Sequence, residues 1–139
     1  MSDDLIPVFD GHNDTLLRLV LGGGNRDAKS FFVAGKSGHI DLPRARKGGF
    51  CGGLFAMFTP SRGLGEKTLD LSPDDPGNFA PVAQKVAEPF TLKMFEMARA
   101  VERLSDGDVV IAHSAGEARQ AMADGKLVII LHIEGVECL

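Results

Sequence analysis

The sequence predicts an α/β protein built on a parallel sheet, and two observations favour this class. Apolar runs of strand length alternate with segments of helical periodicity, in the order strand, helix, strand, helix, strand. The runs at 50–58 and 127–133 are apolar on both faces, which is typical of strands inside a parallel sheet. With 44% hydrophobic residues among 139, the chain has enough apolar side chains for one core. We expect helices outside the sheet, which is either a barrel or doubly wound.

The first elements follow from apolar runs and their interruptions. Residues 5–9 form a short apolar strand that stops at the polar stretch 10–14. Residues 15–21 then predict a short helix, ended by the glycines at 22–24. A second short helix is expected at 41–46, before the strand at 50–58.

Two long segments connect this strand to the next. Residues 59–80 contain three prolines and three glycines, which predicts a long irregular loop, and Arg62 and Lys67 in it are expected to be solvated or to meet a substrate carboxylate. Apolar residues repeat at helical spacing over 89–104, with Pro89 in the first turn.

The last third predicts a strand, a helix and a strand. Residues 109–112 are β-branched and apolar, and Ser114 and Glu117 have the spacing of a capping box that opens a helix running to about Asp124. The run 127–133 is the clearest strand of the chain, and it ends at Glu134.

Composition excludes several classes of protein. A formal net charge of −4 with both signs mixed along the chain provides no basic stripe for nucleic acid. The longest apolar run is far too short to span a membrane, and the start is acidic where a signal peptide is basic, so a cytoplasmic location is expected. Two cysteines are too few for a disulfide framework, and Cys51 and Cys138 lack zinc-finger spacing. We therefore expect both to behave as small apolar side chains.

A first candidate for metal chemistry lies at the end of the first strand. His12 and Asp14 are two residues apart, so an extended backbone points both side chains to one side. An imidazole nitrogen and a carboxylate oxygen are ligands that suit zinc. Barrel enzymes place their catalytic groups at the carboxyl ends of their strands. The alternative is a polar turn in which Asp14 caps the following helix.

Glu134 is the second candidate, because it ends the strand at 127–133. A buried carboxylate needs a cationic partner, since an unpaired one costs at least several kcal/mol to transfer from water. The alternative is a solvated carboxylate at a strand end, with Gly135 turning the chain.

Three segments together resemble one family of enzymes. Residues 9–15 (FDGHNDT) resemble the opening motif of the membrane (renal) dipeptidases, peptidase family M19. Residues 40–49 (IDLPRARKGG) look like the next segment of that family, and 133–135 (IEG) look like its bridging-glutamate motif. The segments occur in family order, so the resemblance covers essentially the whole chain.

This resemblance implies a (β/α)8 TIM-barrel-like metal-dependent hydrolase, of which residues 1–139 form the N-terminal part of a single domain. It implies two zinc ions, with His12 and Asp14 on one and Glu134 bridging both as the catalytic carboxylate. It further implies that a metal-bridging hydroxide cleaves dipeptides, including those with a D-residue at the C-terminal position. The family's later histidine ligands are absent, so we expect the remainder of the barrel or a further copy of the chain as a partner.

Alternatives stay open at this point. One alternative is that the chain is part of another barrel metallohydrolase acting on a different amide or ester. Another is that it is a non-catalytic fragment of such an enzyme. His132 shares the face of Glu134 and is expected to contact the site or, more simply, to be a packed, hydrogen-bonded core group. His39 and His113 are expected at the surface, and Asp10 is expected either to hold the backbone near His12 or to be solvated.

Overall fold

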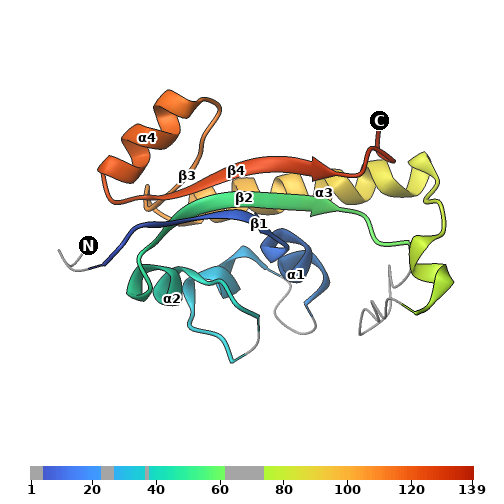
Figure 1. Cartoon of the computed structure of the whole chain (residues 1–139), viewed down its shortest axis with the longest axis horizontal. Coiled ribbons are helices and arrows are strands. Elements are labelled where there is room, and N and C mark those ends of the chain that lie inside the picture. The colour runs from blue at the N-terminus through green and yellow to red at the C-terminus, as the bar shows by residue number, and fades with distance from the viewer. Residues whose placement is uncertain (1–4, 23–26, 37, 62–73) are drawn as a thin grey trace.

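The computed structural model describes residues 5–22, 27–36, 38–61 and 74–139 and contains one four-stranded sheet (Figure 1). All pairings are parallel, in the order β1-β2-β4-β3. The strands are β1 (Val8–Asn13), β2 (Phe50–Phe58), β3 (Val109–Ile111) and β4 (Leu127–Glu134). The α/β class with a parallel sheet is therefore confirmed.

Four α-helices connect and cover the strands. They are α1 (Thr15–Leu21), α2 (Leu42–Lys47), α3 (Gln84–Leu104) and α4 (Ala115–Ala123), with 3-10 segments at Ala28–Phe32 and Pro76–Phe79. The predicted helices after residues 14, 41 and 114 are confirmed. No helix among the described residues is long and apolar enough to cross a membrane.

The main core lies on one face of the sheet. Phe55 and Ile129 of β2 and β4 are buried there with Leu16 of α1 and Met94 of α3. A smaller cluster lies on the other face, where α4 packs on Val128 and Ile130. Neighbouring residues of β4 point to opposite faces, so α3 and α4 cover opposite faces of the sheet.

The strand order explains why helices lie on both faces. The chain passes from β2 beyond β4 to the edge strand β3, and then returns to β4. Right-handed crossovers in opposite directions place their helices on opposite faces. This part of the chain thus has a doubly wound arrangement at its β3 edge, and closure of the sheet into a barrel remains a prediction for the complete protein.

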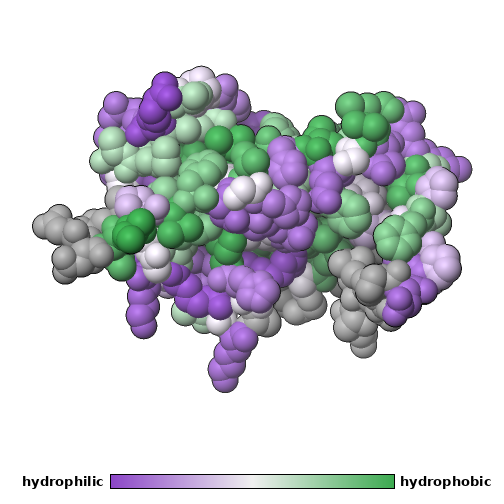
Figure 2. All heavy atoms as spheres, viewed as in Figure 1, coloured by the Kyte–Doolittle hydropathy of each residue, from purple (hydrophilic) through white to green (hydrophobic). Residues whose placement is uncertain are grey.

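Much of the sheet face that α3 does not cover reaches the surface. Figure 2, in the same view as Figure 1, shows hydrophobic side chains between hydrophilic ones on this side. Val8 and Phe9 of β1 are exposed by 48% and 42% of their surface, whereas Ile133 of β4, which is 41% exposed, lies on the same face of the sheet as Ile129 and Met57.

Two element bounds differ from the prediction. β1 begins at Val8 and continues to Asn13, so His12 belongs to the strand rather than to a following loop. α3 begins at Gln84, so Pro89 lies inside the helix instead of in its first turn. A proline costs the helix one hydrogen bond. The turn before it nevertheless forms because it buries Ala87 completely. The loop predicted at 59–80 is described only at its ends, and Arg62, Lys67 and the glycines at 23 and 24 lie outside the described residues.

The start of α4 confirms the capping signal. The Ser114 hydroxyl accepts a hydrogen bond from the Glu117 N–H at 3.1 Å. The Glu117 carboxylate accepts from the N–H of His113 at 2.7 Å, one residue before the position expected of a capping box. His113 is exposed, as predicted.

A buried carboxylate organises the start of α2. Asp41 is 2% exposed, and it accepts hydrogen bonds from the N–H groups of Gly35 and Arg44 at 3.0 Å and from Arg44 Nε at 2.6 Å. Burial by itself raises the pKa of Asp41, but these hydrogen bonds and the Arg44 charge lower it below its usual value. Asp41 is therefore held ionised.

Arg18 links this region to α1. Its guanidinium donates to the Ile40 carbonyl at 2.8 Å. Burial lowers the pKa of Arg18, the charge of Asp41 opposes this effect, and the charge of Arg44 adds to it. The contact ties the residues before α2 to the helix that begins directly after Asp14.

The cysteines are both free thiols. Cys51 is buried in β2 and donates to the Val8 carbonyl at 3.2 Å, and Cys138 is partly exposed. This agrees with the absence of a disulfide framework that the sequence indicated.

Candidate metal centre

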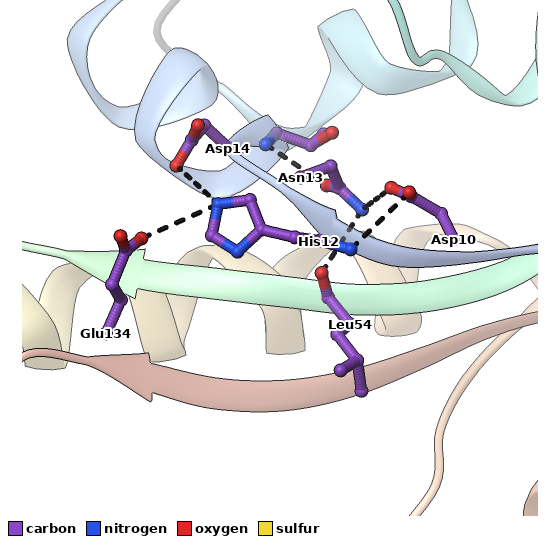
Figure 3. A network of polar contacts seen from close by, with 7 residues as sticks. Asp10, His12, Asn13, Asp14, Leu54 and Glu134 are labelled. Atoms are coloured by element: carbon purple, nitrogen blue, oxygen red, sulfur yellow. Dashed lines mark hydrogen bonds and ion pairs between the residues drawn. The ribbon is translucent and has the colours of Figure 1, made fainter.

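Three side chains converge where β1 and β4 end. His12 Nε2 lies 3.7 Å from Asp14 Oδ1 and 3.5 Å from Glu134 Oε2 (Figure 3). The three residues each offer one ligand atom, and these atoms all lie within 4.8 Å of one another. The structure therefore brings together the three residues that the sequence singled out as metal ligands.

His12 and Glu134 meet although their strands are not neighbours in the sheet. β2 lies between β1 and β4, so the two outer backbones are about 10 Å apart, twice the usual spacing of neighbouring strands. Glu134 is paired with Phe58 at the end of β2. The imidazole of His12 bridges the gap by extending across the end of β2 toward Glu134 (Figure 3).

An irregularity in β1 directs His12. Asp10 pairs with Gly53 and Asn13 with Phe55, so β1 advances three residues while β2 advances two. The extra residue makes a bulge, a feature that bends a strand and re-aims a side chain. His12 lies inside this bulge.

A small polar network surrounds the bulge. The Asp10 carboxylate accepts from the His12 N–H at 3.4 Å and from Asn13 Nδ2 at 3.1 Å. Asn13 Nδ2 also donates to the Leu54 carbonyl of β2 at 3.4 Å. Asp10 thus holds the backbone of His12, which was one of the two roles considered for it.

Asp14 occupies the N-cap position of α1 but does not cap it. Its side chain makes no capping hydrogen bond, and the N–H of Thr15 is satisfied by Asn13 Oδ1 at 3.2 Å. The Asp14 carboxylate faces His12 instead. The alternative that Asp14 serves as a helix cap is therefore wrong.

A cleft of about 550 Å³ opens beside the three residues. Its polar wall includes Glu137, Ser61 and Asn78, and its apolar wall is formed by residues of α1, β2 and the segment before α3, namely Leu17, Phe58, Phe79, Ala80 and Pro81. An apolar cleft with a few convergent polar groups is the usual form of a small-molecule site.

The membrane dipeptidase family model (Peptidase family M19) matches residues 4–139, nearly the whole chain. The chain belongs to the membrane dipeptidase family. The resemblance seen in the sequence motifs is confirmed by this match.

Over the segment that matches, the relatives are identical to the chain at about a third of the positions. A protein of Acinetobacter calcoaceticus, named "Uncharacterized protein in PQQ-III 3'region", is 34% identical over 134 residues. Two solved structures match with TM-scores of 0.78 and 0.77 at 33% and 34% identity. The first is a metallo peptidase from Rhodobacter sphaeroides with a phosphinate mimic of the dipeptide L-Ala-D-Ala, and the second is the dipeptidase AC, a metallo peptidase of family M19.

The chain corresponds to only part of each of these proteins. The matches cover 96–98% of the chain but 42% of the Acinetobacter protein and 40% and 39% of the two solved chains. The matching α/β fold is therefore that of a portion of a larger metallopeptidase fold.

The donor set of this chain fits a divalent metal. Donors about 2.1 Å from one tetrahedral zinc ion lie about 3.4 Å apart, and His12 Nε2 lies 3.5 and 3.7 Å from the two carboxylates. The offered oxygens of Asp14 and Glu134 lie within 4.8 Å of each other, so the two carboxylates repel, and a cation between them removes the repulsion. Imidazole nitrogen and carboxylate oxygen are both ligands that zinc accepts.

The environment of Glu134 differs from the prediction. Its side chain is 48% exposed, so the argument from a buried, unpaired carboxylate is wrong. β4 ends at this residue, and Gly135 turns the chain with a φ of 78°, which leaves the carboxylate at the rim of the sheet. Its interaction with His12 follows from tertiary position rather than from burial.

His132 contacts the site in an unexpected way. Its ring packs edge-on against His12, with ring centroids 5.2 Å apart and an interplanar angle of 68°. Its Nε2 is buried and has no hydrogen-bond partner among the described residues, so the expectation of a hydrogen-bonded histidine is wrong for that atom. His39 is exposed, as predicted.

Sequence reasoning missed most of the cleft. It considered a substrate contact only for Arg62 and Lys67 in the loop after β2, and it did not single out Phe58, Phe79 or Glu137. Phe79 is 73% exposed at the end of the 3-10 segment Pro76–Phe79, and this position carries no local signal of a binding role. The bulge in β1 also has no signature in the sequence except the glycine at position 11.

Proposed function

We propose that the complete protein is a zinc-dependent dipeptidase and that His12, Asp14 and Glu134 are metal ligands. The observation that carries the proposal is the convergence of these three side chains beside a cleft, in a chain that belongs to the membrane dipeptidase family. Glu134, which has two carboxylate oxygens, is the residue we propose to bridge two ions. The other ligands of the second ion would come from parts of the protein outside this chain.

The chain's own residues would divide the work between metal and substrate. Bound zinc supplies activation of water near neutral pH and stabilisation of negative charge on a carbonyl oxygen. The cleft walls formed by Leu17, Phe58 and Phe79 would hold the small side chains of a dipeptide, with Glu137 placed to meet its amino group. We further propose that dipeptides with a C-terminal D-residue are substrates, because the similar Rhodobacter metallo peptidase was crystallised with a mimic of L-Ala-D-Ala.

Hydrolysis assays on the complete protein test this function. The protein is stripped with a chelator, reloaded with zinc, and offered L-Ala-L-Ala, L-Ala-D-Ala, their N-acetylated forms and a simple ester. We expect zinc-dependent cleavage of free dipeptides, including L-Ala-D-Ala. Cleavage of another amide or the ester while every dipeptide is untouched would instead indicate another metallohydrolase.

Metal binding tests the ligand assignment separately from activity. Calorimetry with the isolated 139-residue chain should detect weak binding of one zinc ion that is lost in His12→Ala and in Asp14→Ala. Binding that survives both substitutions would show that the ligands lie elsewhere.

A further inference from the structure

Asn13 lies between two proposed ligands but does not line their cleft. Its amide joins three parts of the fold. Nδ2 donates to Asp10 Oδ2 at 3.1 Å across the bulge of β1 and to the Leu54 carbonyl of β2 at 3.4 Å, while Oδ1 accepts from the N–H of Thr15, the first residue of α1, at 3.2 Å. One side chain therefore connects β1, β2 and α1.

The contact between Asp10 and Asn13 requires the bulge. In a regular strand, residues three apart point to opposite faces, so their side chains do not meet. The extra residue in β1 between the pairs Asp10–Gly53 and Asn13–Phe55 removes this difference and lets the amide meet the carboxylate. The hydrogen bond in turn is available only while the bulge persists.

Gly53 leaves the room that this contact needs. A Cβ atom added to Gly53 would lie 2.9 Å from both the Cβ and the carbonyl oxygen of Asp10 and 3.4 Å from Asn13 Nδ2. Such a contact with Asp10 is too close for a real Cβ atom. The opposing strand is thus shaped around the Asp10–Asn13 pair.

We infer that Asn13 is a positioning residue that clamps the β1 bulge and thereby aims His12 and Asp14 at Glu134. A strand that loses its bulge shifts its register by one residue, and each following side chain then turns to the other face. His12 would then point away from Glu134. The inference rests on the proposed function, because it assigns Asn13 a role toward the proposed metal ligands.

The test measures metal affinity of the complete protein rather than its activity. Zinc affinity is obtained by competition with a chromophoric chelator, and the visible absorption of the cobalt-loaded protein reports the coordination geometry. The variants are Asn13→Asp, Asn13→Ser, the exchange Asp10→Asn with Asn13→Asp, and His12→Ala. Thermal unfolding is recorded for each variant.

Asn13→Asp keeps the shape of the side chain but places a second carboxylate against Asp10. Asn13→Ser retains a hydroxyl to accept from Thr15 but is too short to reach Asp10, so it separates the start of α1 from the bulge. We expect both to weaken zinc binding by about 10- to 100-fold, as removal of groups that orient metal ligands does, and to alter the cobalt spectrum.

The exchange variant is the decisive rescue. With Asn at position 10 and Asp at position 13, an amide again donates to a carboxylate across the bulge, and we expect zinc affinity to recover by about tenfold over Asn13→Asp. Because the exchange also relieves the repulsion between two carboxylates, the cobalt spectrum and thermal unfolding are compared: a merely structural effect would change the unfolding temperature without changing the coordination geometry.

The outcomes separate the two proposals. If His12→Ala weakens zinc binding but Asn13→Asp and Asn13→Ser leave it unchanged, the clamp is wrong and the ligand assignment stands. If the exchange variant binds as weakly as Asn13→Asp, Asn13 does not act through Asp10 and the clamp is also wrong. If His12→Ala has no effect, the ligand assignment itself fails.

Discussion

The Nε2 atom of His12 lies 3.5 Å from Oε2 of Glu134, although the two residues belong to strands that are separated by β2 and lie near opposite ends of the chain. The cross-strand distance is bridged because β4 ends at Glu134 and because β1 is bulged at His12. A site of this kind depends on the register of two strand pairings at once.

Glu134 and Glu137 provide a matched pair of carboxylates in one cleft. Glu134→Gln removes a proposed ligand and should weaken zinc binding by at least about 100-fold, more than the loss of a group that only orients a ligand. Glu137→Gln changes the same kind of side chain outside the group of three and should bind zinc within about twofold of the wild type, because no ligand is lost. Chelator competition measures both, and equal effects would contradict the assignment of Glu134.

Two glycine substitutions test the packing around the bulge. Gly53→Ala should lower the free energy of unfolding by about 1–3 kcal/mol, because its Cβ would lie 2.9 Å from backbone and side-chain atoms of Asp10. Zinc affinity should fall with it as Asp10 is displaced.

Gly11→Ala is the control, since a Cβ there meets nothing within 4 Å. It should change the free energy of unfolding by less than about 0.5 kcal/mol. Urea unfolding of the two variants provides the comparison, and a larger loss in Gly11→Ala than in Gly53→Ala would show that the described packing of β1 on β2 is incorrect.

The lowered pKa of Asp41 should make the stability of the fold depend on pH. Its pKa is lowered in the folded protein, so its ionised form stabilises the fold above the unfolded pKa, and this stabilisation is lost as the pH falls through the folded pKa. Asp41→Asn should cost about 3 kcal/mol at pH 7, because Arg44 loses its partner and the N–H of Gly35 meets an amide NH2.

The difference between Asp41→Asn and the wild type should shrink below about pH 4, the usual value of an unfolded aspartate, and disappear below the folded pKa. Urea unfolding across this range measures it. Asp124→Asn, at an exposed position, should stay within about 0.5 kcal/mol of the wild type throughout. A difference for Asp41→Asn that is constant with pH would contradict the role of its charge.

Two substitutions of His132 distinguish the effect of its ring packing from the effect of its buried nitrogen. His132→Phe keeps an aromatic ring against His12 and removes a buried nitrogen without a partner among the described residues, so stability should rise by about 1 kcal/mol. His132→Ala loses the ring contact and should be less stable than the wild type by about 1–2 kcal/mol. Zinc affinity should stay within about twofold in His132→Phe; a tenfold loss would mean that the His132 nitrogen itself acts on the site.

The sequence predicts the elements whose signals lie within a few neighbouring residues. The strand at Phe50–Phe58 and the helices after Ser114 and Asp41 were predicted within a residue or two, because apolar periodicity and capping side chains act over one or two turns. β1 was misplaced because its residues 10–13 are polar or glycine. They become strand only because β2 supplies hydrogen bonds beside them.

For the candidate site as well, the residues with metal-binding chemistry were predicted, but their contacts were not. The motif residues identified His12, Asp14 and Glu134, but the burial argument for Glu134 was wrong, because its side chain is exposed. The Asp14 side chain faces His12 and makes no capping hydrogen bond, which rules out the alternative of a helix cap. Asn13 and Gly53 were not singled out, because their roles exist only where β1 and β2 meet.

The amino-acid sequence by itself determined the α/β class, most helices and strands, and which side chains have the chemistry to hold a metal, since these depend on periodicity, turn residues and residue type. Only the tertiary structure decided that β4 lies next to β2 on the side away from β1, that β1 carries a bulge, and that an imidazole from one strand reaches a carboxylate from another. Strand order and register depend on contacts between distant segments, and no local pattern of residues encodes the distance between their ends.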